Sequence, residues 1–334
     1  MSGSHQVTGK SHRGLVRPSN EDYLHLDENH AVYAVCDGMG GHQAGEIASM
    51  TASETIQTVF DHFQQELLAA SDLSLGQTLT QKGDLLVKAI RLANRAIYTR
   101  AATDPALAGM GTTVVAAAIE GDMMSIAHVG DSRAYRLEEK RLVPLTSDHS
   151  WVSEMQQNGL IAKEDVLSMV GKNVITRALG VRENIEIDYR LIKIKPGDIF
   201  VLCSDGLCGF ADDDEIFAVA RKVRKNLNRM VDDLIQLAND RGGSDNVTVI
   251  AIEVGEVAPS QTEEMEVVTL PAEPPDLLQV EDQWLTKIDA LKTTESTSKL
   301  KSPSGNPTSK LLLTIIFAVF IILAGVLIYF STGK

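Results

Sequence analysis

Short apolar runs that end on an acidic residue and a glycine recur along the chain. The first complete example is the run 30–36, which predicts a buried strand and leads into Asp37 and the glycine-rich turn 38–41. From Gly45 to about Gln65 the apolar residues return every three or four positions, which predicts a helix. We therefore expect the Asp37 carboxylate to lie where a buried strand turns into a helix.

The same apolar periodicity predicts the remaining elements. The predicted helices are 84–102, 150–159, 213–220 and 229–240, and the predicted strands, besides 30–36, are 23–26, 112–119, 123–129, 133–137, 142–145, 185–191, 199–203 and 247–253. The short Gly- and Asp-containing turns between several strands favour antiparallel pairing. These patterns alone establish an α+β fold with helices in pairs.

Carboxylates stand at the ends of several predicted strands. Besides Asp37, this group consists of Glu21, Asp22, Asp131, Asp205 and Asp245. A single strand–Asp–Gly turn is usually structural, so no one of these motifs indicates a site by itself. Together, and without a His or Cys cluster, they predict an all-oxygen site of the kind that Mg²⁺ or Mn²⁺ prefers.

The order of these motifs is similar to that of a known family. The motifs are Arg17 with Asn20-Glu21-Asp22, Asp37-Gly38-Met39-Gly40-Gly41-His42, Gly111-Thr112-Thr113, Gly130-Asp131-Ser132-Arg133, Asp148-His149-Ser150, Thr176-Arg177-Ala178-Leu179-Gly180, Ser204-Asp205-Gly206-Leu207 and Asp245-Asn246. Over about residues 8–255 the chain resembles the metal-dependent serine/threonine phosphatases of the PPM (type 2C) family, in their bacterial form. The resemblance implies a four-layer α-β-β-α sandwich of two antiparallel sheets flanked by helix pairs.

The resemblance also implies how the metal ions are bound. Asp37, Asp205 and Asp245 would be direct ligands of two Mn²⁺ or Mg²⁺ ions, with the carbonyl of Gly38 completing one coordination shell. A water shared by two such ions loses a proton readily and can attack phosphorus directly. The implied reaction is therefore hydrolysis without a covalent enzyme intermediate.

Further residues match family positions around the metal ions. Glu21 and Asp22 would bind through metal-bound waters, and Asp131 would help to hold a third, weaker ion. Arg17 is the candidate phosphate clamp, because a planar guanidinium binds two phosphoryl oxygens at once. His42 could be a general acid for the leaving group or a structural residue, since Met39 stands where animal enzymes carry their histidine.

Three functions from different classes fit this site to different degrees. The resemblance implies hydrolysis of phosphoserine and phosphothreonine on proteins, opposing a bacterial Ser/Thr kinase. A membrane-tethered pseudophosphatase that only binds phosphoproteins is the alternative, but such proteins usually lose ligand aspartates and this chain keeps them. A general two-metal phosphodiesterase is disfavoured by the order of the motifs.

Composition restricts the partners and the compartment. The net charge of −14 argues against nucleic acid as a partner, whereas bound divalent cations would reverse the sign locally at a phosphate site. The three cysteines form no disulfide framework, and the first residues carry no apolar signal segment. We therefore expect a reducing, cytoplasmic environment for the catalytic domain.

The composition changes after the catalytic domain, which we expect to span residues 1–256. Residues 257–310 are acidic and rich in Pro, Ser and Thr, which predicts a tether, with a possible short helix over 276–292. Residues 311–330 carry no charge and would span about 30 Å as a helix, enough to cross a bilayer. Lysines before this span predict a single-pass anchor in the cytoplasmic membrane, with only a tail, 331–334, on the far side.

Overall fold

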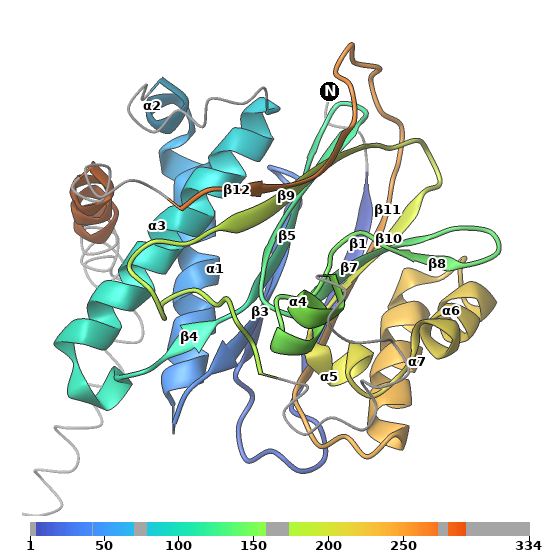
Figure 1. Ribbon diagram of the computed structural model, residues 1–334. Helices are drawn as coiled ribbons and strands as arrows, with labels where there is room; N and C mark the ends of the chain where they lie inside the picture. The colour runs from blue at the N-terminus through green and yellow to red at the C-terminus, as the bar shows by residue number, and fades with distance from the viewer. Residues whose placement is uncertain (1–4, 42, 70–78, 158–173, 273–279, 292–334) are drawn as a thin grey trace, which may run out of the picture. The chain divides into compact units, whose positions relative to one another are not determined.

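Two antiparallel β-sheets form the centre of the fold (Figure 1). The computed structural model describes residues 5–41, 43–69, 79–157, 174–272 and 280–291. The five strands of the first sheet are, in spatial order, β1 (Gln6–His12), β11 (Val247–Glu253), β10 (Ile199–Cys203), β7 (Arg133–Leu137) and β8 (Leu142–Pro144). All neighbours in this sheet run antiparallel, as predicted.

The second sheet has seven strands. They are, in spatial order, β12 (Met265–Leu270), β9 (Ile187–Lys193), β6 (Met123–Val129), β5 (Val114–Glu120), β3 (Val32–Met39) and β2 (Asp22–Asp27), with the short β4 (Gly111–Thr112) paired to β3. Its pairs are antiparallel as well. The predicted α+β class with two antiparallel sheets is thus confirmed.

Helices cover the outer faces of the two sheets (Figure 1). Up to the end of β11 the described helices are α1 (Ala44–His62), α2 (Gln64–Ala69), α3 (Gln81–Thr103), η2 (Pro105–Leu107), α4 (Trp151–Gln157), α5 (Asp205–Cys208), α6 (Asp213–Lys222) and α7 (Leu227–Asp240). The pair α1 and α3 packs on the seven-stranded sheet, and α6 and α7 pack on the five-stranded sheet. The layers therefore follow the order helix pair, sheet, sheet, helix pair.

The core between the sheets comes from side chains that alternate along the strands. Val35 of β3 and Val115 of β5 belong to the same buried cluster as Phe200 and Leu202 of β10 and Ile250 of β11. Burial of this apolar surface holds the two sheets face to face. Because strands from both sheets end at the same side of this core, the acidic residues at their ends are brought together.

The strand β12 lies inside the segment 257–310 that the sequence predicts to be a tether. Leu270 at its end is fully buried, and the strand pairs with β9 from Leu270 opposite Ile187 to Met265 opposite Leu191. The strand has the sequence Met-Glu-Val-Val-Thr-Leu, and the proline-rich, acidic residues around it gave no indication of a strand. In this part the structure differs from the predicted tether, because the segment completes a sheet.

The chain contacts the catalytic domain again after β12. Residues 280–291 are helical and lie within the predicted helix 276–292. Asp282 receives two hydrogen bonds from the guanidinium of Arg95 on α3, at 2.7 and 2.9 Å. Trp284 packs edge-on against Phe63, with ring centroids 5.9 Å apart. The packed domain therefore extends beyond the predicted boundary at residue 256.

No helix among the described residues is long and apolar enough to cross a membrane. The predicted span 311–330 and the tail 331–334 lie outside the described residues.

Candidate metal centre

Asp22 and Asp37 face each other across neighbouring strands. They form a register pair between β2 and β3, at the end of the ladder. One carboxylate oxygen of Asp22, Oδ2, accepts hydrogen bonds from the hydroxyls of Ser204 at 2.8 Å and Thr248 at 2.7 Å. These two hydroxyls come from the other sheet, so Asp22 ties the sheets together directly beside Asp37.

The backbone around Asp37 is fixed by short contacts. Its N–H donates to Thr113 Oγ1 at 3.1 Å, and its carbonyl accepts from Thr112 Oγ1 at 2.9 Å. A β-carbon on Gly38 would lie 2.5 Å from the carbonyl oxygen of Glu21, a distance that real side chains do not tolerate. Only glycine allows the chain to turn this closely behind the aspartate.

Two more carboxylates reach the centre from the neighbouring strands β7 and β10. Asp205 is the first residue of α5, directly after β10, and Asp131 lies in the turn between β6 and β7. Because β7 and β10 pair side by side, these two aspartates stand at the same end of the five-stranded sheet. The structure thus brings together four of the predicted acids: Asp22, Asp37, Asp131 and Asp205.

Asp245 and Arg17 lie at the rim of the same centre. The Arg17 guanidinium donates to Asp245 Oδ2 at 2.8 Å and to the carbonyl of Ser244 at 3.3 Å. Asn246 accepts a hydrogen bond from the N–H of Glu21 and so holds the segment of Glu21 and Asp22 against the start of β11. Arg17, half-exposed, is placed where a ligand bound at the acidic centre could meet its guanidinium.

The crowded carboxylates hold their protons more tightly than usual. Burial, together with the charges of Asp205 and Asp245, raises the pKa of Asp22 to about 7, against the opposing hydrogen bonds that it accepts. Burial and the charges of Asp205 and Asp148 raise the pKa of Asp131 to about 7. A bound cation would remove this mutual repulsion.

Burial also raises the pKa of the two central aspartates. After burial, the charges of Asp22, Asp205 and Asp131 contribute most to the raised pKa of Asp37. The charge of Asp245 is the next contribution to the raised pKa of Asp205. Each of these acids therefore acts electrostatically on the others, as expected for one shared site.

The donor set fits divalent cations. Three buried carboxylate oxygens, Asp22 Oδ1, Asp131 Oδ1 and Asp205 Oδ1, accept no hydrogen bond within the part of the chain that the structure describes. A buried anionic oxygen without a donor is costly unless a cation neutralises it. Hard oxygen donors without cysteine or histidine match Mg²⁺ and Mn²⁺. The residues present therefore suit the predicted ions.

Some functional neighbours were not predicted from the sequence, and one predicted residue is not described. Ser204, Thr248 and Asn246 support the acids through hydrogen bonds. Ser204 and Asn246 stand in the motifs quoted above without a role of their own, and Thr248, inside β11, carries no signal in the sequence. His42, predicted as a general acid or a structural residue, lies outside the described residues.

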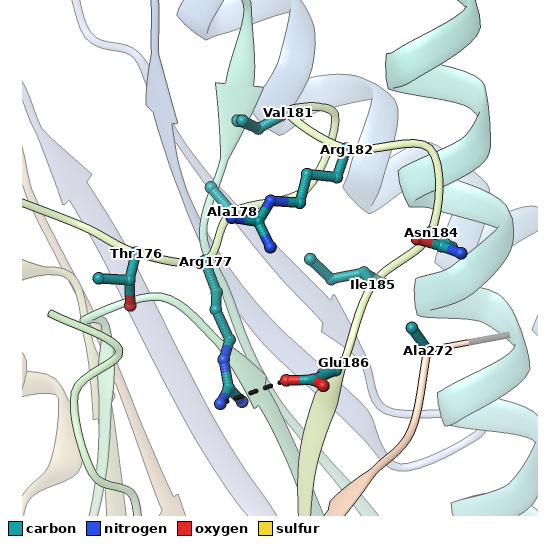
Figure 2. A pocket seen from close by; sticks show the side chains of 9 residues that line it. All are labelled: Thr176, Arg177, Ala178, Val181, Arg182, Asn184, Ile185, Glu186 and Ala272. Atoms are coloured by element: carbon teal, nitrogen blue, oxygen red, sulfur yellow. Dashed lines mark ion pairs between the residues drawn. The ribbon is translucent and has the colours of Figure 1, made fainter. Parts of the chain in front are cut away.

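A cavity of about 130 Å³ lies outside the acidic centre, between residues 176–186 and the chain after β12 (Figure 2). Arg177 and Glu186 form an ion pair at its edge, 3.3 Å apart, and Arg182 and Ala272 also line it. The cavity shows that residues after β12 help to shape the surface next to segment 174–180.

The sequence matches the family model described as protein phosphatase 2C over residues 8–247. This chain belongs to that family. The match includes every predicted site residue and ends at the first residue of β11. The strand β12 and the helix at 280–291 lie beyond it.

Relatives with solved structures or curated descriptions resemble about three quarters of the chain. The serine/threonine phosphatase stp of Listeria monocytogenes is 36% identical over 247 residues, which cover 73% of this chain and 94% of that protein. The crystal structure of the phosphatase PstP of Mycobacterium tuberculosis has a TM-score of 0.64 at 32% identity, covering 75% of this chain and 99% of that one. A structure of the PstP catalytic domain with two manganese ions has a TM-score of 0.62 at 31% identity, with the same coverage.

Proposed function

We propose that the chain is a metal-dependent protein phosphatase that hydrolyses phosphoserine and phosphothreonine and reverses the action of a Ser/Thr kinase. The observation that supports it most is the cluster of buried carboxylates with unpaired oxygens, Asp22, Asp131 and Asp205, beside Asp37. The relatives named above are serine/threonine phosphatases, and one of them binds two manganese ions. Retention of every ligand carboxylate disfavours the pseudophosphatase alternative.

The acidic residues would have different roles in binding the metal ions. Asp37, Asp205 and Asp245 would hold two Mn²⁺ or Mg²⁺ ions, with the Gly38 carbonyl as a further ligand. Such ions, when bound, lower the pKa of a water and neutralise phosphoryl oxygens. Glu21 and Asp22 would bind these ions through metal-bound waters, and Asp131 would contribute to a third ion.

Arg17 supplies the fixed positive charge of the proposed site. Its guanidinium already lies 2.8 Å from Asp245, so a phosphoryl group at the centre would come within its reach. Two parallel N–H groups match two phosphoryl oxygens and orient the phosphorus toward the attacking water.

Release of phosphate from a phosphoserine and a phosphothreonine peptide tests the proposal. We expect the full-length protein in detergent to release phosphate with Mn²⁺ or Mg²⁺, to stop in excess chelator, and to resume when metal is restored. Full turnover in excess chelator would contradict the metal-dependent mechanism. Tight binding of the phosphopeptide without any turnover would instead favour the pseudophosphatase.

We also propose that residues 311–330 anchor the enzyme in the cytoplasmic membrane, with the catalytic domain in the cytoplasm. Twenty uncharged residues in succession support this, as do lysines at 299, 301 and 310 on one side of the segment. The anchor would restrict the enzyme to phosphorylated proteins near the membrane surface.

Membrane fractionation measures this anchor directly. We expect the full-length protein to stay in the membrane pellet through high salt and alkaline carbonate, and to be released only by detergent. A variant with Leu→Asp changes at positions 312 and 323 should appear in the soluble fraction, because two charges in the span oppose insertion. Release of the unaltered protein by carbonate would show peripheral binding and contradict the anchor.

A further inference from the structure

Three ionisable side chains from separate parts of the fold meet behind the acidic centre. They are His128 on β6, His149 after β8 and Asp188 on β9, and their ligand-type atoms lie within 4.8 Å of one another. The two imidazole rings stack with centroids 4.3 Å apart. Burial and the neighbouring His149 lower the pKa of His128 to about 3, so this ring is an uncharged packing partner.

The hydrogen bonds of His149 fix the position of its proton. The N–H of Gly130 donates to His149 Nδ1 at 3.1 Å, so the proton of the neutral ring must sit on Nε2. His149 Nε2 lies 3.1 Å from Asp188 Oδ2, so the carboxylate faces this N–H at close range, although Nε2 makes no hydrogen bond within the described residues. A metal ion at Nε2 is disfavoured, because metal-bound histidines donate their other N–H and here the other nitrogen accepts.

The turn that His149 contacts is the one that carries Asp131. The His149 N–H donates back to the Gly130 carbonyl at 2.8 Å, so two hydrogen bonds join these residues. Gly130 has φ of +115°, and a β-carbon there would lie 2.6 Å from the side chain of Thr113. Thr113 in turn accepts the hydrogen bond from the N–H of Asp37. The turn is therefore held between His149 and the backbone of the metal centre.

Asp188 connects this turn to two other segments. Its Oδ1 accepts hydrogen bonds from Thr269 Oγ1 of β12 at 2.7 Å and from the Arg177 guanidinium at 3.2 Å. Arg177 also pairs with Glu186 at the edge of the cavity in Figure 2. Each carboxylate oxygen of Asp188 is thus engaged on a different side, one toward His149 and one toward β12.

We propose that His149 and Asp188 are positioning residues that hold the Gly130–Asp131 turn in the shape that binds metal. Thr269 extends this network to β12, a strand outside the residues 8–247 that match the family model. The inference rests on the proposed function, which assigns Asp131 to a metal ion. It gives the segment after the catalytic core a direct physical connection to the metal centre.

Equilibrium binding of Mn²⁺ to the full-length protein in detergent tests the network, with the paramagnetic resonance signal of the free ion as the readout. Asp131→Asn identifies the site that depends on the turn. Asp188→Asn removes the negative charge that faces His149 Nε2 and replaces one carboxylate oxygen by an amino group, so we expect about tenfold to a hundredfold weaker binding at that site. Thr269→Val should weaken it about threefold, and Thr269→Ser should restore it.

Glu266→Gln is the matched control. Glu266 joins β12 to Arg190 of β9 at 3.3 Å but does not contact Asp188, so its loss weakens strand docking alone. We expect this variant to bind Mn²⁺ like the unaltered protein.

Two kinds of outcome separate the inference from the function on which it rests. If the unaltered protein binds no Mn²⁺, the proposed function fails. If it binds Mn²⁺ and the Asp188 and Thr269 variants bind equally well, or Glu266→Gln loses as much, the network is refuted. Should Asp188→Asn fail to fold, the comparison of Thr269→Val with Thr269→Ser decides.

Discussion

Asp37→Asn should lower kcat/KM for a phosphoserine peptide by about a thousandfold, since a lost metal removes several kcal/mol of transition-state stabilisation. Asp37 lies at the centre of the acidic cluster, where burial and then the charges of Asp22, Asp205 and Asp131 raise its pKa. The amide keeps the shape of the side chain and one oxygen but removes the negative charge that two cations would share. Steady-state assays at saturating Mn²⁺ measure the loss.

The control for this variant is an aspartate of the same type outside the centre. Asp232→Asn removes an exposed partner of Lys10 and should leave the activity unchanged. At pH 8 without metal, Asp37→Asn should be at least as stable as the unaltered protein, because it relieves repulsion among crowded carboxylates. Retained activity would contradict the role of Asp37 as a metal ligand, and a large loss of stability would show that it is structural.

Arg17→Ala should reduce kcat/KM by about tenfold to a hundredfold, mostly through KM, while Mn²⁺ binding persists. A hydrogen bond to a charged group contributes about 1.5–3 kcal/mol, which corresponds to this range. In the structure Arg17 contacts Asp245 and the Ser244 carbonyl rather than a buried partner, so removing it should disturb the fold little. Peptide kinetics and Mn²⁺ titration of the same sample measure both quantities.

Two further variants define the role of Arg17. Arg17→Lys should recover only part of the activity, because an ammonium cannot bind two phosphoryl oxygens side by side. Arg229→Ala, which removes an exposed arginine paired to Asp233 on α7, should behave like the unaltered enzyme. If the loss in Arg17→Ala follows Mn²⁺ occupancy instead, the arginine supports the metal site and does not clamp phosphate.

The sequence predicted the acidic centre because each acid follows or precedes an apolar strand, and such strands carry their own signal. It did not predict β1, since Gln6–His12 has few apolar residues and becomes a strand only by pairing with β11. The strand β12 was not predicted either, because it lies within a proline-rich segment and is stabilised by pairing with β9. Propensity is weak for strands whose stability comes from distant partners.

The supporting residues of the site were beyond prediction for a related reason. Asn246 reaches the carbonyls of Arg13 and Ser19 and the N–H of Glu21, more than two hundred residues away in sequence. No local pattern marks an asparagine for such contacts. The acids could be named from the sequence, but the groups that orient them required the fold.

The pairing of β1 with β11 determines when the enzyme can become active during its synthesis. Gln6 lies opposite Glu253, so nearly the whole catalytic domain must leave the ribosome before the first strand finds its partner. Closing so long a loop is slow, and an unpaired strand edge is prone to aggregate. Asp245, two residues before β11, is also the last acid of the centre to be synthesised. A nascent chain therefore cannot complete the metal centre until the five-stranded sheet can close, and premature hydrolysis by an incomplete domain is avoided.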